Sequence, residues 1–597
     1  MKYPTLHPNE STRQMVDAFK GYNHNLRIGD GEFFDMRNMT SAHYPVLSPR
    51  GTRGVYASPE QPGGLIAKDS LCYVDGTDFI VNNYRLDMGL STEKEDCPKQ
   101  LISMGAYVII MPDKKYINTA NTTDFGNIEA EFTTEAPVSF TLCKIDGSDY
   151  MAEYTQSDEP ADPANMTLWV DTSTTPHSLK QWSETSSMWV SIATTYVKIS
   201  SAGIGAAFEQ YDGINISGLK DTALIDNASG LEIENTTELA ALEGAAVVWD
   251  RGENYIVIVG MLDITRTITN PVTISRKMPS MDFVIESENR LWGCRYGMAS
   301  NGEVVNELYA SKLGDFKNWN CFMGLSTDSY AASVGTDGVF TGAITHMGYP
   351  LFFKENFIHK VYGNYPANFQ IQTTACRGVQ RGCERSLAIV NEMLYYKARH
   401  AVCAYDGSLP AEISYVMGEE RYNNAVAGSH GNKYYISMAD AAGVYHLFVY
   451  DTAKGLWHKE DNLRADAFCS CRDELFCIEH GTNKIITMLG SGTKDTKAVE
   501  WMVQTGPLGT DEPDMKYISR LVLRMSLEIG ARVRFFIQYD SIGGWESIGM
   551  MSGTSLKSFS IPIRPRRCDH FRLRIVGTGD ARIYSETKTI ERGSDIS

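Results

Sequence analysis

The sequence lacks any apolar stretch long enough to cross a bilayer as a helix. The longest apolar run, residues 255–262, has eight residues and includes a glycine, whereas a spanning helix needs roughly 20. The first eight residues, MKYPTLHP, have no apolar segment of the secretory type. We therefore expect no membrane-spanning segment and synthesis in the cytoplasm.

Cysteine occurs without the spacing of a disulfide framework or of a zinc site. The chain has 12 cysteines, which we expect to be reduced thiols. The densest metal candidate is Cys469, Cys471, Cys477 and His480, but a C-x-C pair is unusual for structural zinc. We interpret these cysteines, and the pair Cys376 and Cys383, as small core residues. The sequence predicts no metal and no cofactor.

Basic residues are fewer than acidic ones. The chain has 55 Lys and Arg against 73 Asp and Glu, a net charge of −18. This argues against a protein that grips nucleic acid along its whole surface, because phosphate binding needs clustered Lys and Arg. Charged residues at 21% and hydrophobic residues at 43% are typical of a globular chain, and 51 glycines with 11% aromatics favour β-structure.

Catalytic signatures are also missing. The sequence contains no GxxxxGK[ST], HExxH or GxSxG motif. Residues 203–205, GIG, lack the third glycine of a dinucleotide site and predict an ordinary turn. Residues 540–545, DSIGGW, are weakly similar to the Asp-box turn of sialidases, but the glycine comes one place late. We therefore predict that the chain is not an enzyme, with a propeller glycoside hydrolase as the less favoured alternative.

Short strands joined by tight turns make up most of the chain. In residues 71–81 an Asp75-Gly76 turn separates two apolar runs, which is a strong hairpin signal. Similar hairpins are predicted at residues 107–117, 282–293, 351–363, 393–407, 434–457 and 475–488. After residue 280 a two-hairpin unit recurs roughly every 35 to 45 residues, which fits four-stranded propeller blades. The fold class expected is all-β, a β-propeller of about six to eight blades; a long sandwich or two stacked barrels is the alternative.

Five segments follow from this pattern. Residues 1–63 are expected to form a short helix, capped by Ser11 or Thr12 and ended by Gly21, and then an extended arm lying on the first domain. Residues 64–121 would form the first blades and residues 271–497 the remaining ones. Between them, residues 122–270 would form an inserted small β-domain with one helical turn at residues 238–243. Residues 498–597 would form a jelly-roll-like or fibronectin-like sandwich of about six strands.

The densest basic cluster lies near the C-terminus. Arg564, Arg566 and Arg567 are followed by Arg572 and Arg574. The first three are candidates for contacts with acidic groups on a neighbouring subunit, and the alternative is a solvated edge strand of the sandwich.

Several stretches resemble the phage stabilization proteins, the packaged-DNA stabilization or tail-hub (nozzle) family of short-tailed phages. They are residues 31–38 (GEFFDMRN), 44–50 (YPVLSPR), 282–293, 306–320 (NELYASKLGDFKNWN), 334–338, 352–356, 566–569 and 591–594. The resemblance implies a β-propeller subunit of a sixfold homo-oligomeric ring in the virion. The ring would sit below the portal and adaptor proteins and would close or conduct the DNA channel.

The expected function is thus that of a structural virion protein of a head-tail connector or tail hub. The ring would extend and seal the DNA channel and let double-stranded DNA pass without sequence-specific binding. An acidic lumen suits this role, because it repels phosphates and does not retard sliding DNA. The alternative from another class is a tail fibre or receptor-binding structural protein.

Overall fold

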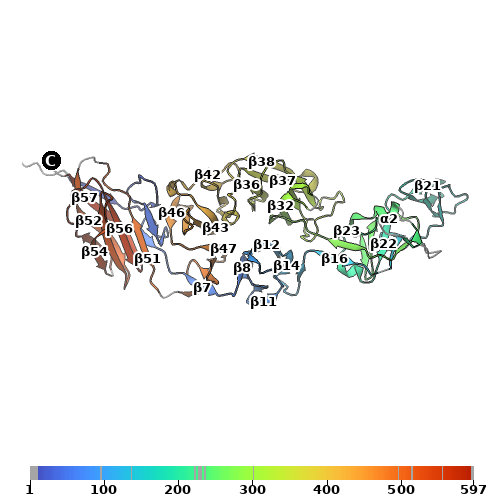
Figure 1. Cartoon of the computed structure of the whole chain (residues 1–597), viewed down its shortest axis with the longest axis horizontal. Helices are drawn as coiled ribbons and strands as arrows, with labels where there is room; N and C mark the ends of the chain where they lie inside the picture. Colours follow the sequence, from blue (N-terminus) through green and yellow to red (C-terminus); the bar gives the residue numbers. More distant parts are fainter. Residues whose placement is uncertain are drawn as a thin grey trace, which may run out of the picture. The chain divides into compact units, whose positions relative to one another are not determined.

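The computed structural model describes residues 11–94, 97–135, 137–220, 224–225, 232–233, 237–299, 302–494, 497–511, 515–553 and 555–592. Strands dominate it, and its two α-helices, α1 (Ile204–Ala207) and α2 (Thr237–Ala241), are single turns (Figure 1). Within these ranges no helix is long and apolar enough to cross a membrane. The described chain forms two compact units, one of residues 1–101, 338–360 and 372–597 and the other of residues 102–337 and 361–371.

Small antiparallel sheets of four strands follow one another along unit 1. The first contains β8 (Pro62–Ala67), β9 (Leu71–Asp75), β10 (Asp78–Val81) and β11 (Tyr84–Asp87), paired in chain order. Gly76, with φ +62°, makes the predicted turn between β9 and β10. The next three sheets repeat this order: β35 (Gly342–His346), β36 (Tyr349–Lys354), β37 (Phe357–Tyr362) and β38 (Gln370–Ala375); β39 (Ala388–Val390), β40 (Met393–Lys397), β41 (Val402–Tyr405) and β42 (Ala411–Glu412); β43 (Asn423–His430), β44 (Lys433–Ala439), β45 (Tyr445–Asp451) and β46 (Leu456–Lys459).

The N-terminal arm completes the last of these sheets. Strand β7 (Gly54–Ala57) pairs with β49 (Lys484–Thr487), next to β48 (Glu474–Glu479) and β47 (Ala465–Cys471). This sheet also packs on the first one, since Leu71 of β9 shares a core with Phe476 and Ile478 of β48. The chain therefore joins its first sheet to its last through both hydrogen bonds and an apolar core.

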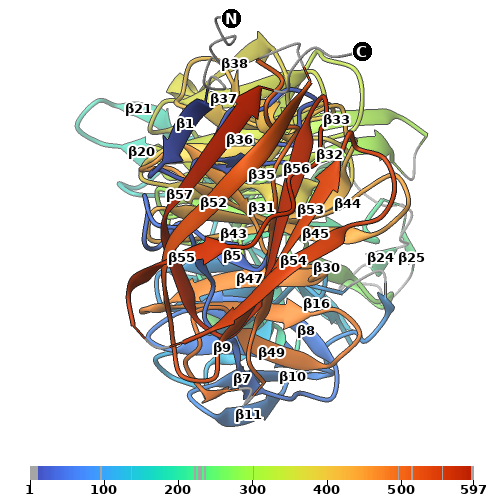
Figure 2. The ribbon, with the colours of Figure 1, turned by 90° about the vertical axis from the view of Figure 1, so that its left-hand side faces the viewer.

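The C-terminal residues form a sandwich of two sheets (Figure 2). One sheet has the order β1 (Ser11–Val16), β57 (Ala581–Arg592), β52 (Lys516–Leu527) and β55 (Lys557–Ile561). The other has the order β4 (Asp35–Arg37), β51 (Glu500–Gln504), β56 (Phe571–Thr578), β53 (Arg532–Tyr539) and β54 (Glu546–Ser552). Alternate residues of both sheets are buried in one cluster, as expected for two packed sheets.

One expectation for the N-terminus is wrong, and a second holds for only part of the arm. The helix predicted from Ser11 to Gly21 is strand β1, in which Ser11 pairs with Glu591 and Val16 with Glu586. The free edge of β57 supplies hydrogen bonds over six residues, and this outweighs a weak helix signal. Of the arm, expected to lie on the first domain, the end at Ala57 packs on the first sheet, whereas its earlier part gives one strand to each sheet of the sandwich, β1 and β4.

Unit 2 begins and ends with two further four-stranded sheets. One contains β12 (Gln100–Met104), β13 (Tyr107–Met111), β14 (Lys115–Asn118) and β15 (Phe125–Asn127). The other contains β31 (Phe283–Ser287), β32 (Arg290–Met298), β33 (Val304–Ala310) and β34 (Tyr330–Ser333). Ile109 and Met111 of the first share a core with Val284 and Leu291 of the second. The two sheets are thus spatial neighbours although about 150 residues separate them.

The intervening residues form three further sheets, and we call this part of unit 2 the inserted domain. Strands β16 (Ala130–Thr133) and β30 (Thr273–Arg276) pair directly, so the chain enters and leaves this part of unit 2 on neighbouring strands. The inserted domain contains a four-stranded sheet (order β16, β30, β23, β26), a seven-stranded sheet (β25, β24, β29, β17, β22, β28, β27) and a small four-stranded sheet (β18 to β21). Their bounds are β17 (Val138–Cys143), β18 (Tyr154–Gln156), β19 (Leu168–Asp171), β20 (Ser178–Ser183), β21 (Met188–Ser191), β22 (Tyr196–Ser200), β23 (Gly213–Ser217), β24 (Leu224–Ile225), β25 (Glu232–Ile233), β26 (Gly244–Val247), β27 (Asp250–Gly252), β28 (Tyr255–Val259) and β29 (Arg266–Ile268). The helical turn expected at residues 238–243 is α2, whereas the turn expected at residues 203–205 begins α1.

Candidate functional site

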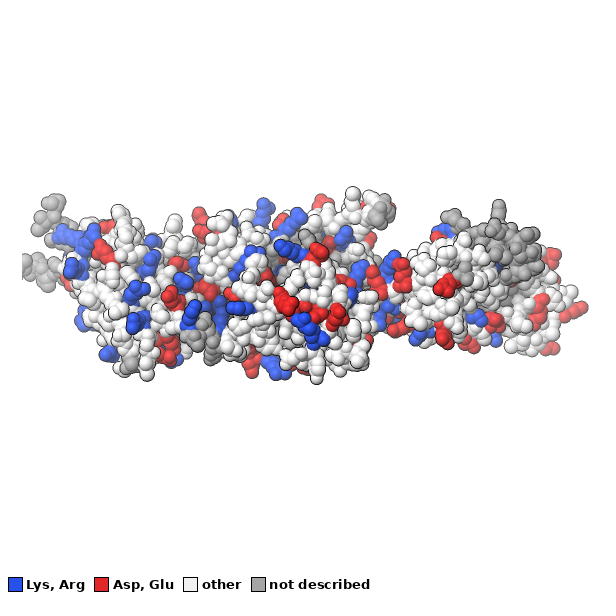
Figure 3. All heavy atoms as spheres, turned by 60° about the horizontal axis from the view of Figure 1, so that its bottom comes forward, with Lys and Arg blue, Asp and Glu red and all other residues white. Residues whose placement is uncertain are grey.

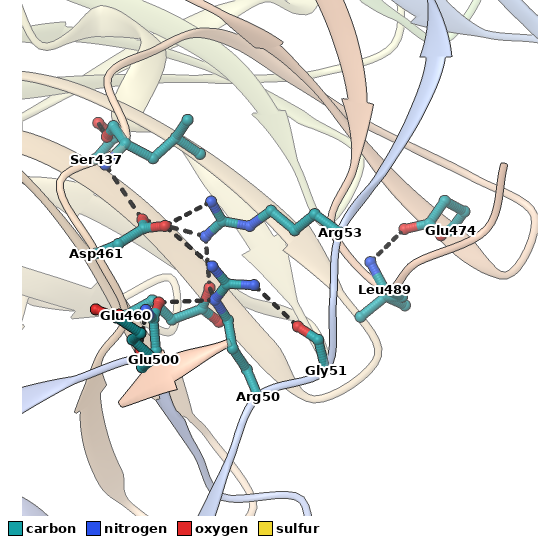
Figure 4. Close-up of polar contacts among 11 residues, drawn as sticks. Arg50, Gly51, Arg53, Ser437, Glu460, Asp461, Glu474, Leu489 and Glu500 are labelled. Atoms are coloured by element: carbon teal, nitrogen blue, oxygen red, sulfur yellow. Dashed lines mark hydrogen bonds and ion pairs between the residues drawn. The ribbon is translucent and has the colours of Figure 1, made fainter. Parts of the chain in front are cut away.

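Two arginines of the N-terminal arm and two acidic residues after β46 form a buried ion-pair cluster (Figure 4). Arg53 Nη1 lies 2.8 Å from Asp461 Oδ2, and its Nη2 lies 2.7 Å from Glu460 Oε2. Arg50 Nη2 lies 3.2 Å from Asp461 Oδ2. The side chains of Arg50 and Arg53 are only 14% and 13% exposed. The charges of this cluster are therefore balanced mainly by one another and not by solvent.

The surrounding charges set the protonation states of this cluster. Burial works to raise the pKa of Asp461, but the guanidinium groups of Arg53 and Arg50 outweigh it and hold that pKa below its ordinary value. Burial likewise opposes the charge on Arg53, and Asp461 and Glu460 overcome it and raise the pKa of Arg53. Asp461 and Arg53 are therefore charged at neutral pH, and the charge of each depends on its partners.

The cluster also ties the arm to the sandwich. Arg50 Nε donates to Oδ1 of Asn38 (2.9 Å), and Nδ2 of Asn38 donates to the carbonyl of Glu500 on β51 (2.7 Å). The backbone N–H of Asn38 donates to the carbonyl of Glu460 (2.6 Å). The structure thus uses these residues to fasten three segments together.

The predicted subunit-contact residues lie in a loop of the sandwich. Arg564, Arg566 and Arg567 are exposed between β55 and β56, so the alternative of a solvated edge strand is wrong. Arg566 Nη1 lies 3.1 Å from Oε1 of Glu546, and its guanidinium lies 5.2 Å from the ring centre of Tyr539. Their role in subunit contact stays a prediction.

The structure places four arginines on an outward face of the sandwich, of which Arg532 and Arg534 are not part of the basic cluster found from the sequence. Arg532 and Arg534 of β53 alternate outward with buried valine and phenylalanine, and Arg572 and Arg574 do so on β56. Gln538 pairs with Arg572 and Phe536 with Arg574, so the two strands bring these side chains to one face. We call Arg532, Arg534, Arg572 and Arg574 the arginine face. The sequence alone gave Arg532 and Arg534 no role, although their spacing of two is a strand signal.

Aromatic rings cover part of the arginine face. The guanidinium of Arg574 lies 4.1 Å from the ring centre of Trp545, and that of Arg572 lies 5.1 Å from that of Phe34. Burial lowers the pKa of both arginines from its ordinary value, although both remain charged at neutral pH. Such half-buried, stacked arginines are suited to contacting carboxylates of a protein partner.

The negative charge of the chain lies entirely in unit 2. This unit has 14 Lys and Arg against 32 Asp and Glu, so its charge is 14 − 32 = −18, whereas unit 1 has 41 of each. Residues 122–270 alone have 6 basic and 23 acidic residues, which gives 6 − 23 = −17. On the face drawn in Figure 3, acidic atoms outnumber basic atoms over the inserted domain. The charge therefore belongs to one domain and is not spread over the molecule.

The cysteine candidates do not form a ligand set. Cys469 pairs with Phe476 and Cys477 with Phe468, so the two thiols point to opposite faces of their sheet and enter different cores. His480 Nδ1 instead lies 2.9 Å from Oδ1 of Asp466. Cys383 is buried, and its sulfur accepts a hydrogen bond from the N–H of Ala425. The inserted domain, in contrast, brings together His177, Glu238 and Asp263, which no sequence spacing connects.

The Asp-box-like stretch forms the turn between β53 and β54. Asp540 has φ +55°, and its Oδ1 accepts the backbone N–H of Asp569 (2.7 Å) and of His570 (3.3 Å). Its carboxylate is thus used to hold two turns of the sandwich together.

Comparison with known proteins gives structural likeness only. No protein-family model and no curated protein sequence matches the chain. Among solved structures, an exo-β-1,3-galactanase from Phanerochaete chrysosporium matches with 8% identity and a TM-score of 0.21, over 51% of this chain and 94% of its own. A glycoside hydrolase matches with 11% identity and a TM-score of 0.19, over 50% and 96%. Trypanosoma rangeli sialidase matches with 8% identity and a TM-score of 0.21, over 97% of both chains.

These matches correct one expectation. The prediction that the chain is not an enzyme does not stand, because the solved structures it matches are glycoside hydrolases and a sialidase. At these identities and TM-scores the likeness assigns no reaction, substrate or catalytic residue to this chain.

Proposed function

We propose that the chain is a structural virion protein of a phage head-tail connector or tail hub (nozzle), whose ring of copies extends and seals the DNA channel. In this proposal seven small sheets are blades of one β-propeller. Six have four strands, β8–β11, β12–β15, β31–β34, β35–β38, β39–β42 and β43–β46, and the seventh has five, β47–β49 with β7 and β50 (Thr493–Lys494). Their sequential order and the pairing of β7 with β49 support this, because propellers commonly close by adding an N-terminal strand to the last blade.

The single observation that carries the functional proposal is the separation of charge. A net charge of −18 in unit 2 and of zero in unit 1 gives the chain one unit suited to repelling phosphate. If the inserted domain lines the channel, packaged DNA meets an acidic surface. Contact with this surface releases few counterions from the DNA, so the DNA gains little free energy by binding to it. DNA then slides past without being held, which ejection requires.

The contacts between the N-terminal arm and the rest of unit 1 support a mechanical role for the arm. The stretches that resemble the phage family supply Asn38 and Arg50, which link the arm to β51 and to the residues after β46. An N-terminal arm held at Asn38 and Arg50 by part-buried polar contacts resists being pulled out of its sheets. The arginine face then offers a positively charged surface for an acidic neighbour, such as the portal or adaptor proteins or another copy.

The test is the number of copies of this chain per purified particle, measured by quantitative mass spectrometry against the portal protein. We expect six to twelve copies, on the portal axis in a cryo-EM map. About three copies, or a large multiple of three, would replace this proposal with a tail fibre or receptor-binding protein. Absence from particles, together with polysaccharide cleavage that one carboxylate substitution abolishes, would replace it with a glycoside hydrolase.

A further inference from the structure

Three segments of the inserted domain bring a histidine and two carboxylates to one point. His177 directly precedes β20, Glu238 lies on α2, and Asp263 lies in the loop between β28 and β29. One ligand atom from each, an imidazole nitrogen or a carboxylate oxygen, lies within 4.8 Å of the others. This bound is close to the upper limit of about 4.4 Å for two atoms that each lie about 2.2 Å from one metal ion.

Two of these ligand atoms are buried and make no hydrogen bond. Nδ1 of His177 and Oε1 of Glu238 face each other as an ion pair, and neither takes part in a hydrogen bond. The side chain of Glu238 is only 8% exposed. The imidazole of His177 is the group that faces this buried carboxylate oxygen, and a bound cation would compensate its charge more fully.

The remaining polar atoms are occupied in a way that orients the ligands. Oε2 of Glu238 accepts the backbone N–H of Asp263 (3.3 Å). Arg266 Nη2 donates to Oδ1 (2.7 Å) and Oδ2 (3.0 Å) of Asp263. Outer-sphere partners of this kind fix the direction of metal-binding carboxylates.

The scaffold around the three residues is rigid. Leu239, next to Glu238, and Leu262, next to Asp263, are fully buried in the core of the inserted domain. Leu179, two residues after His177, is buried in the core of the small sheet β18–β21. Each candidate ligand is therefore held by an apolar anchor nearby in the chain, as a site with fixed geometry requires.

We propose that His177, Glu238 and Asp263 bind a first-row divalent transition-metal cation, with Zn²⁺ as the preferred ion. One imidazole and two carboxylates form a mixed nitrogen and oxygen set that Mg²⁺ and Ca²⁺ do not favour. The ion fastens α2 and the loop after β28 to the small sheet β18–β21. The acidic inserted domain, with its charge of −17, raises the local cation concentration.

The electrostatics of Glu238 agree with this site. Burial raises the pKa of Glu238 from its ordinary value, and the neighbouring carboxylate of Asp263 raises it further. Arg266 neutralises only one of the two carboxylates. A divalent ion would compensate the charge of the second carboxylate.

The experiment uses the full chain, stripped with a chelator and titrated with Zn²⁺ alone by isothermal titration calorimetry. After desalting, elemental analysis should find one zinc per chain, and Glu238→Gln and Asp263→Asn should each weaken binding at least tenfold. His480→Gln is the matched control, because His480 pairs with Asp466 but lacks a third ligand among the described residues. It should bind zinc as the wild type does.

Cysteines are a competing source of zinc binding, and Co²⁺ separates the two. At the proposed site Co²⁺ should show no thiolate-to-metal charge-transfer absorption, and millimolar Mg²⁺ should not displace it. If the wild-type protein retains no stoichiometric zinc, the proposal is overturned. This outcome does not depend on whether the variants fold. Undiminished binding by Glu238→Gln, or a thiolate absorption band, also overturns it. This result is independent of the copy number of the chain in particles.

Discussion

At the scale of single residues, Arg53 combines strong burial with two acidic partners. Replacing it by glutamine leaves Asp461 and Glu460 in a buried site with only Arg50 to pair with. We expect Arg53→Gln to lower the free energy of unfolding of unit 1 by about 3–5 kcal/mol, as for other broken buried ion pairs. Thermal unfolding followed by calorimetry would measure this.

The control for this prediction is a solvent-exposed pair. Arg377 and Glu412 are 57% and 41% exposed and lie 3.0 Å apart. Arg377→Gln should change stability by less than about 1 kcal/mol. Equal effects of the two substitutions would show that the buried cluster does not hold the arm.

The lowered pKa of Asp461 predicts how the stability of the protein depends on pH. Its folded-state pKa is lowered, so its contribution is fully present above the unfolded pKa, near 3.9, and is lost as pH falls through the folded pKa. Wild type should therefore exceed Asp461→Asn in melting temperature at pH 7 and at pH 5. The difference should shrink below about pH 4. A difference that is constant from pH 7 to pH 3 would contradict this assignment.

At the scale of elements, β7 depends on a close approach of backbones. A Cβ on Gly54 would lie 2.2 Å from the carbonyl oxygen of Ser491, whereas one on Gly51 would meet nothing within 4 Å. We expect Gly54→Ala to cost about 1–3 kcal/mol. Gly51→Ala should be close to neutral. Hydrogen exchange of the β49 amides would report the difference, since only Gly54→Ala should expose that strand.

At the scale of the whole molecule, the charge separation predicts weak binding of DNA. The full chain should bind a short DNA duplex with a dissociation constant above about 10⁻⁴ M at physiological salt, weaker than proteins with nonspecific DNA affinity. Fluorescence anisotropy over a range of salt would measure this. Micromolar binding with a steep salt dependence would contradict a channel surface that does not retain DNA.

The exposed arginines between β55 and β56 predict how copies of the chain assemble. Reversing the charge of Arg564 and Arg567 together should shift the chain from rings toward monomers in analytical ultracentrifugation. Lys484→Glu, an exposed position on β49, is the control and should leave assembly unchanged. Normal assembly of the double variant would remove these residues from the subunit contact.

Local turn chemistry made much of the fold predictable. Asp75-Gly76 and the apolar runs around it predicted β9 and β10, because a tight turn and alternating side chains depend only on neighbouring residues. Strand β1 was not predicted, since Ser11–Val16 becomes a strand only by pairing with β57, more than 500 residues away.

The sequence by itself determined the class of structure, the order of the segments and the net charge, because these depend on composition and local propensity. Only the tertiary structure decided the contacts between residues that are far apart in the sequence. It placed the arm in the sandwich, buried Arg53 against Asp461, and assembled the arginine face from two strands. It also brought His177, Glu238 and Asp263 together. Such contacts join residues whose separation along the chain carries no signal, and only the packed core sets their distances.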